Sequence, residues 1–248
     1  MTIADDVLRA KKDIDDAFNA GKKSEYDTFW DTYQNNGNRG NYNYAFYNQF
    51  WNDNTFLPKY DIKPQGGSNR LQSMFYSSGI TDLKSILERN GVYIDLTEYD
   101  GSTGLAATFE GSAITHIGRI KYPEYVKQYA YTFSGCTDLH TIDEVHLSPD
   151  GSTVWQSNVL SNCRSLVNIT ITGVIGQNDF DIHWSTQLSQ ASIYSITDSL
   201  SPTTSGLTVT LSKAAVDTAF SEGDVIGSES QGWQQVIDYR DNWTIALI

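Results

Sequence analysis

The chain has 248 residues, which is enough for one large domain or two small ones with a sizeable core. Its 30 acidic residues outnumber its 17 Lys and Arg, and a net charge of −13 argues against a nucleic-acid partner, whose phosphates require clustered basic side chains. No stretch approaches the roughly 18 apolar residues of a membrane span, so we expect no membrane insertion.

The N-terminal segment, residues 2–20, has the spacing of an amphipathic helix. Its apolar residues recur at alternating steps of four and three, which is the a/d seam of a coiled coil: Ile3, Val7, Ala10, Ile14 and Ala17. This seam is too thin to be stable alone. We therefore predict that residues 1–21 form an oligomerisation or docking helix, with a homo-trimer as the expected assembly, or fold back on their own domain.

Residues 22–70 form an aromatic, Asn-rich block that includes the breaker NNGNRG. Aperiodic coil packed with rings is typical of an end unit that covers the first apolar layer of a stacked protein, so we predict an aromatic N-terminal cap. The Asn and Asp cluster WNDNT at 51–55 lacks the twelve-residue calcium loop pattern and indicates turn chemistry instead.

Four stretches in the middle of the chain repeat an apolar spacing. Two of them, YTFSGCTDLHTI and VLSNCRSLVNI, share offsets of three, six and nine: Phe133, Cys136, Leu139 and Ile142, then Leu160, Cys163, Leu166 and Ile169. Two earlier copies match each other but lack the Cys: Phe75, Ile80, Leu83 and Ile86, then Phe109, Ile114, Ile117 and Ile120. Copies that recur in this way along a chain are typical of stacked units, each made of a strand and a turn. We therefore expect the rings, the thiols and the aliphatic side chains to form ladders along the stack.

The pattern F-x-x-C-x-x-L-x-x-I resembles the BspA-like branch of the leucine-rich repeat proteins, which are surface and adhesion proteins rather than enzymes. The resemblance implies an α+β fold with a short, irregular leucine-rich-repeat solenoid over residues 71–175. The aromatic block, through FWDTYQNNGNR, YNYAF and FLPKYDI, and the tail both resemble segments of repeat proteins from gut bacteria and their phages.

The only cysteines, Cys136 and Cys163, occupy the same repeat position. A disulfide needs side-chain vectors that converge, whereas a ladder makes them parallel. We therefore predict two buried free thiols that act as small hydrophobic residues.

Residues 176–248 predict a compact helical and strand cap. SQASIYSITDSL at 189–200 reads as a helix with Ile193, Ile196 and Leu200 on one face. A strand at LTVTLS, helices at KAAVDTAF and GWQQVIDY, and a strand at NWTIALI follow, with Leu207 and Leu247 expected in paired strands.

The sequence contains no catalytic or dinucleotide-binding motif, and we predict no catalytic residue, metal site or cofactor. The four histidines, His116, His140, His146 and His183, lack metal-ligand spacing, and with 30 acidic residues some pair of carboxylates is inevitable. Amphipathic rings are the better candidates for ligand binding, because they stack on sugars and anchor protein contacts. The alternative is that they fill the interior: Tyr93, Tyr99, Tyr122, Tyr125, Tyr129 and Trp155.

These features favour a non-enzymatic phage virion appendage, a fibre, spike or decoration protein that attaches to a polysaccharide or protein of the bacterial host surface. Its partners would be other virion proteins or copies of itself, because repetition raises avidity. The chain shows neither a secretory signal nor an anchor, so we expect a partial chain or a virion protein rather than a complete adhesin. The alternatives are a bacterial surface adhesin fragment, extracellular or at the cell surface, and a carbohydrate-active enzyme.

Overall fold

The computed structural model describes residues 73, 75–79, 94–95, 106–121, 130–155, 158–220 and 242–248. The predicted N-terminal helix (1–21), the aromatic block (22–70) and the helix predicted at 232–239 lie outside the described residues.

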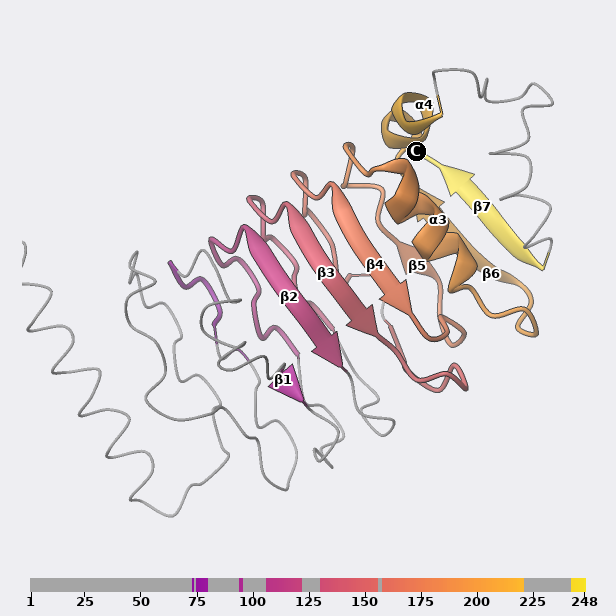
Figure 1. The fold of residues 1–248 in the computed structure, drawn as a ribbon, viewed down its shortest axis with the longest axis horizontal. Coiled ribbons are helices and arrows are strands. Elements are labelled where there is room, and N and C mark those ends of the chain that lie inside the picture. The colour runs from indigo at the N-terminus through magenta and orange to yellow at the C-terminus, as the bar shows by residue number, and fades with distance from the viewer. Residues whose placement is uncertain are drawn as a thin grey trace, which may run out of the picture.

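Four parallel strands lie side by side in sequence order: β1 (Ile94–Asp95), β2 (His116–Lys121), β3 (Thr141–His146) and β4 (Asn168–Thr172) (Figure 1). Ile117 pairs with Ile142, and Ile142 pairs with Ile169. All three are at most 2% exposed, so they form one buried aliphatic row across the sheet. Because parallel neighbours require the chain to return to the same end of the sheet, each strand is followed by a crossing back.

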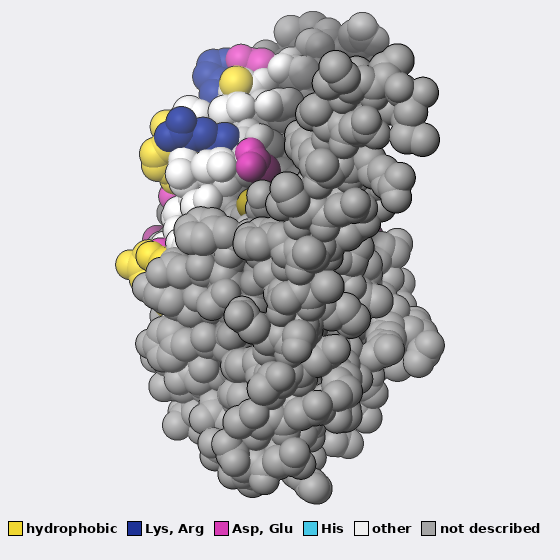
Figure 2. Space-filling view, turned by 90° about the vertical axis from the view of Figure 1, so that its left-hand side faces the viewer, with side chains coloured by type: hydrophobic (Ala, Val, Ile, Leu, Met, Phe, Trp, Pro, Cys, Tyr) yellow, Lys and Arg dark blue, Asp and Glu magenta, His cyan; other side chains and the backbone are white. Residues whose placement is uncertain are grey.

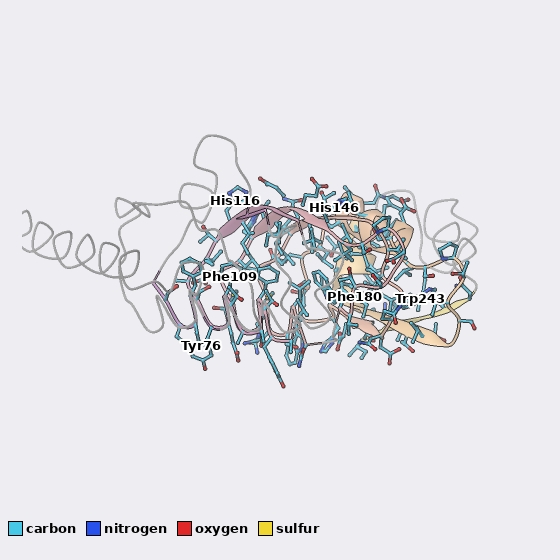
Figure 3. The ribbon with its side chains drawn as sticks, turned by 90° about the horizontal axis from the view of Figure 1, so that it is seen from below. Tyr76, Phe109, His116, His146, Phe180 and Trp243 are labelled. Atoms are coloured by element: carbon cyan, nitrogen blue, oxygen red, sulfur yellow. The ribbon has the colours of Figure 1, made fainter. Side chains whose placement is uncertain are left out.

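The return path passes through four corner turns, which contain Phe75, Phe109, Phe133 and Leu160. The rings of the three phenylalanines are stacked with centroids 5.4 Å apart, at interplanar angles of 11° and 1°. Each turn also hydrogen-bonds to the next: the Phe109 amide donates to the Thr132 carbonyl, and the Phe133 amide to the Val159 carbonyl, both at 2.9 Å. Figure 3 shows Phe109 between the strands and the outer side of the turns. The ring ladder predicted from the sequence spacing is confirmed.

The corner turns repeat an unusual backbone conformation two residues after the buried Phe or Leu. Ser77, Gly111, Gly135 and Asn162 have φ values of 48°, 65°, 74° and 61°. This left-handed region favours Gly and Asn, which explains two Gly and one Asn among the four. The spacing of the apolar residues did not reveal this feature, although it recurs in every one of these turns.

The cysteines connect successive corner turns. The Cys136 thiol donates to the Phe109 carbonyl at 2.9 Å, and the Cys163 thiol donates to the Phe133 carbonyl at 3.0 Å. Both are free and buried, as predicted. Burial raises the pKa of Cys136 to about 11, so the thiol keeps the proton that it donates at neutral pH.

Matching the apolar residues of the second and third repeat copies in order would pair Ile120 with Ile142, but in the structure the second copy is shifted by one apolar position. Ser112, three residues after Phe109, takes the position of the cysteines, and its hydroxyl lies 3.5 Å from the Cys136 sulfur. In the same copy Ile120 pairs with Val145, not with Ile142. The copy is one residue shorter between the turn and the strand, which moves the aliphatic positions that follow.

A fifth corner turn continues the stack beyond residue 175. Ile182, Ser185 and Leu188 repeat the offsets of three and six, and the Ser185 hydroxyl donates to the Cys163 carbonyl at 2.9 Å. The turn leads into helix α3 (Gln190–Asp198) where the earlier turns lead into a strand. Ile193 and Ile196 on α3 are buried, and so is Leu200 just after the helix, which confirms the predicted apolar face.

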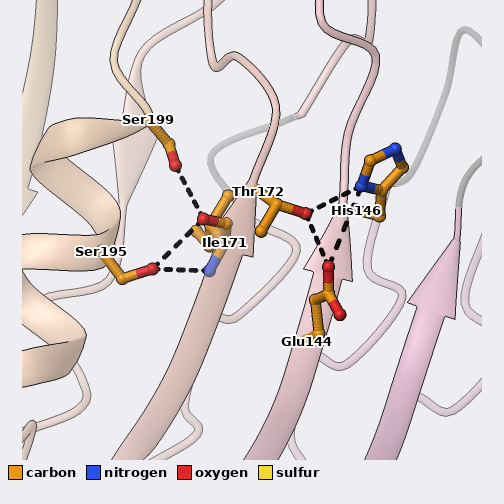
Figure 4. Close-up of polar contacts among 6 residues, drawn as sticks. All are labelled: Glu144, His146, Ile171, Thr172, Ser195 and Ser199. Carbon is orange, nitrogen blue, oxygen red and sulfur yellow. Dashed lines mark hydrogen bonds and ion pairs between the residues drawn. The ribbon is translucent and has the colours of Figure 1, made fainter.

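Serine hydroxyls of α3 and its C-cap take the place of a fifth strand along β4 (Figure 4). The Ile171 amide donates to the Ser195 hydroxyl at 2.7 Å, and the Ser199 hydroxyl donates to the Ile171 carbonyl at 3.0 Å. One turn earlier, the Ile169 amide donates to the Ser192 hydroxyl at 2.9 Å. The backbone groups at this edge of the sheet are therefore satisfied by side chains.

A second parallel sheet contains β5 (Phe180–Asp181), β6 (Leu207–Leu211) and β7 (Trp243–Leu247), in that order. Helix α4 (Lys213–Ala219) follows β6 directly, and its N-cap Ser212 accepts from the Ala215 amide. The strands predicted at 207–212 and 242–248 and the helix predicted at 213–220 are confirmed. Leu207 and Leu247 both lie in paired strands, although their partners are Trp243 and Leu211.

Candidate binding surface

Two surfaces carry the outward-pointing side chains of the stack: the outer face of β2–β4 and the outer side of the corner turns. Figure 3 shows His116 and His146 on the strand side and Tyr76 on the opposite, turn side. Each surface crosses several turns, so neighbouring positions come from segments about 25 residues apart in the sequence, as the pairing of Ile117 with Ile142 shows.

A polar and aromatic group lies on the turn side at the C-terminal end of the stack. We call it the turn-edge cluster: Asn162, Arg164, Asp181, His183 and Trp184. Two neighbouring corner turns supply it. Ile182 and Ser185 take the inward positions of the fifth turn and are fully buried, so His183 and Trp184 between them point outward.

Aromatic contacts join the members of this cluster across the two turns. The Arg164 guanidinium lies over the Trp184 ring, 5.6 Å from its centroid, in the geometry of a cation–π contact. The His183 ring lies 4.7 Å from the Trp184 ring at an angle of 35°. Trp184 remains 38% exposed, one of three large exposed hydrophobic side chains among the described residues.

Hydrogen bonds fix the polar groups around that ring. The Arg164 Nε donates to the Asn162 Oδ1 at 2.6 Å, and the His183 Nδ1 lies 2.6 Å from the Asp181 Oδ1. Asp181 also accepts from the His183 amide at 3.1 Å. The cluster thus presents a ring, a cation and an oriented imidazole, a set that can stack on an apolar surface and bind an anion next to it.

The outer face of the four-stranded sheet carries a second polar group. His116 Nε2 on β2 lies 2.8 Å from Asp143 Oδ1 on β3. The Thr172 hydroxyl on β4 donates to Glu144 Oε1 at 2.9 Å and lies 2.8 Å from His146 Nδ1, which Figure 4 shows as a connected group. These contacts tie adjacent strands together on the solvent side.

The histidines of this face are paired with hydroxyl and carboxylate groups. His140 is another of the histidines considered in the sequence, and its Nδ1 lies 3.3 Å from the hydroxyl oxygen of its neighbour Thr141. Within the described residues no group of three His, Cys, Asp or Glu side chains is arranged to hold a metal ion. The contacts of His116 and His146 join adjacent strands, whereas that of His140 is local.

Trp155 does not belong to either surface. Its side chain is 1% exposed, and its ring packs 5.6 Å from that of Phe180. This placement corrects the expectation of an exposed ring. The polar sequence SPDGS before it indicates a surface loop, but Thr153 and Trp155 turn inward and Gly151 is buried as well.

The other predicted ligand-binding and oligomerisation residues lie outside the described residues: Tyr93, Tyr99, Tyr122, Tyr125, Tyr129, Ile3, Val7, Ala10, Ile14 and Ala17. Sequence reasoning missed Trp184 and Arg164. The signal was present in the offsets of Ile182, Ser185 and Leu188, which mark a fifth turn and place Trp184 at its apex.

Figure 2 shows one side of the molecule, on which the described surface carries basic, acidic and hydrophobic side chains close together. Among the described residues no helix combines the length and apolar character needed to cross a membrane. No protein-family model, curated protein or solved structure matches the chain.

Proposed function

We propose that the chain is a non-enzymatic attachment protein, an α+β leucine-rich-repeat solenoid of the BspA-like kind carried on a phage particle. Its role is to bind a polysaccharide or protein on the surface of a bacterial host. The appendage would be a fibre, spike or decoration protein that contacts other virion proteins or copies of itself.

The observation that supports this proposal best is the register of the stack. Equivalent residues of successive turns lie in contact, from the ring pair of Phe75 and Phe109 to the bond between Ser185 and Cys163. Most inward positions are filled by apolar side chains, so the outward positions are free to vary without loss of the core. A surface of this kind suits recognition, because an extended polymer can touch several turns at once.

The direct test is attachment of the purified full chain to cells. We expect fluorescently labelled protein to bind saturably to at least one strain in a panel of gut bacteria, and unlabelled protein to compete with it. Periodate oxidation of the cells should abolish the signal if the partner is a polysaccharide, and protease treatment should do so if it is a protein. The heat-unfolded chain is the control, and an absence of saturable binding across the panel would contradict the proposal.

The alternative is a fragment of a bacterial surface adhesin, which shares the same binding surface but not the particle. Mass in solution separates the two, because the virion proposal predicts a trimer that falls to monomers when residues 1–21 are deleted. A monomer in both forms favours the adhesin fragment. A third possibility, a carbohydrate-active enzyme, predicts release of products from glycans, and a hydrolysis screen with Asp and Glu substitutions tests it.

A further inference from the structure

We propose that the turn-edge cluster binds a carboxylate-bearing sugar, a hexuronic acid unit of a surface polysaccharide, with Trp184 against the sugar ring and Arg164 on the carboxylate. This inference rests on the proposed attachment function and names the chemistry of its ligand. It concerns Asn162, Arg164, Asp181, His183 and Trp184, the residues that define the cluster.

The first step concerns Trp184. Its ring is 38% exposed on the turn side, and its position is fixed by the buried Ile182 and Ser185 on either side. An indole combines an apolar face with a polar N–H, and a pyranose combines an apolar C–H face with a rim of hydroxyls. The two surfaces match in size and in chemistry.

The second step concerns the charge of Arg164. Within the described part of the chain, the close contacts between basic and acidic side chains involve His116, His146, His183 and Lys213, so Arg164 takes part in none there. The one carboxylate of the cluster, Asp181, lies 2.6 Å from His183 Nδ1. Asn162 orients the guanidinium by accepting a hydrogen bond from Nε. The two terminal nitrogens are then placed to make a bidentate contact with a carboxylate.

The third step is the balance between this cation and the net charge of −13. Exposed charges are screened beyond about 8 Å at physiological ionic strength, so distant acidic residues contribute little at the cluster. A contact between Arg164 and a carboxylate acts at less than half that distance. The net charge of the chain therefore does not prevent an anionic sugar from binding at Arg164.

The geometry requires both parts of the ligand at once. Arg164 comes from the fourth corner turn and Trp184 from the fifth, and the cation–π contact holds them together. A neutral sugar would use the ring alone, and an inorganic anion would use the cation alone. Only a ligand that carries a ring and a carboxylate side by side engages both.

The test is titration calorimetry with the full chain and a galacturonic acid hexamer as the probe. Its carboxyl-reduced counterpart, a galactose hexamer, and linear polyphosphate are the comparison ligands. The variants are Trp184→Ala, Arg164→Gln and the charge-matched control Lys213→Gln, which removes an exposed cation paired with Asp217 on α4. Circular dichroism melts identify any variant that fails to fold, and Trp184→Phe and Arg164→Lys then replace it.

We expect the hexuronate to bind the wild type and the Lys213→Gln variant equally. Affinity should fall about 10- to 100-fold in Arg164→Gln, because a charge-assisted contact is lost. Trp184→Ala should lose a similar factor, Trp184→Phe should keep most of the affinity, and Arg164→Lys should lie between wild type and Arg164→Gln. The reduced hexamer and polyphosphate should both bind weakly.

Equal binding of the acidic and reduced hexamers would overturn the inference, as would unchanged affinity in Arg164→Gln or stronger binding of polyphosphate. So would absence of hexuronate binding. The cell assay keeps the two proposals apart: a chain that attaches to cells equally well with and without Trp184 retains the attachment function and loses this site. A chain that binds the hexuronate but no cells retains the site and loses the attachment function.

Discussion

The ring ladder predicts different costs for the same substitution at two neighbouring turns. Phe109 stacks on Phe75 and on Phe133, whereas the neighbour of Phe133 on its other side is Leu160. Replacing Phe by Leu keeps an apolar side chain of the kind that Leu160 already places in this position. Phe109→Leu therefore removes two ring pairs and Phe133→Leu removes one.

The magnitudes follow from the strength of one pair. An aromatic pair contributes about 0.5–1.5 kcal/mol beyond its burial, so we expect the free energy of unfolding to fall by about 1–3 kcal/mol in Phe109→Leu and about half as much in Phe133→Leu. Both rings are at most 1% exposed, so the change in burial nearly cancels between the two variants. The difference between them then measures a single ring pair.

The measurement is equilibrium unfolding in urea, followed by circular dichroism and extrapolated to water. An unchanged slope with denaturant shows that both variants unfold from the same state. Losses that agree within about 0.3 kcal/mol, the ordinary error of such differences, would show that the rings do not act as a stack. A larger loss in Phe133→Leu than in Phe109→Leu would refute the reasoning outright.

Three further outcomes follow from the described contacts. Leu139→Ala or Leu166→Ala should each lower the free energy of unfolding by about 2–5 kcal/mol in urea titrations, and a loss below about half a kcal/mol would contradict their complete burial. Ser195→Ala should cost about 1–3 kcal/mol and speed hydrogen exchange at the Ile171 amide, which donates to that hydroxyl; unchanged exchange would show that the hydroxyl does not protect the strand. The Ser148 and Ser152 hydrogen bonds lower the pKa of Asp150 from 3.8 to about 2, so the turn should be fully formed above pH 4 and loosen as pH falls through 2, read from amide shifts; Asp150→Asn should remove this titration.

The sequence was informative where one physical constraint repeats at a constant spacing. Phe109 and Phe133 occupy equivalent interior positions, and so do Cys136 and Cys163, so the recurrence of these residues along the chain predicted that successive copies stack. The helix at α3 was predictable for a similar reason, because its buried face recurs at helical spacing. In each case apolar residues at a regular spacing mark the positions that face the interior.

The rest was not predictable because different residues satisfy the same constraint. Ser185 replaces the cysteine in the fifth turn and donates to the Cys163 carbonyl of the preceding layer. The cysteine pattern therefore did not reveal this copy in the sequence. Trp155 follows Ser, Asp and Gly residues that indicate an exposed loop, yet the segment returns to the core. Trp184 faces outward because Ile182 and Ser185 face inward, and their offset of three is hard to recognise where Ile and Ser replace Phe and Cys.

The hydroxyl groups of α3 also restrict how copies of this chain can join. An open strand edge invites the backbone of another molecule, but the amides of Ile169 and Ile171 are already bound to Ser192 and Ser195. Filament growth by strand addition is therefore blocked at β4, and the four-stranded sheet ends within its own chain. Any assembly of copies of this chain must therefore use a surface other than the β4 edge.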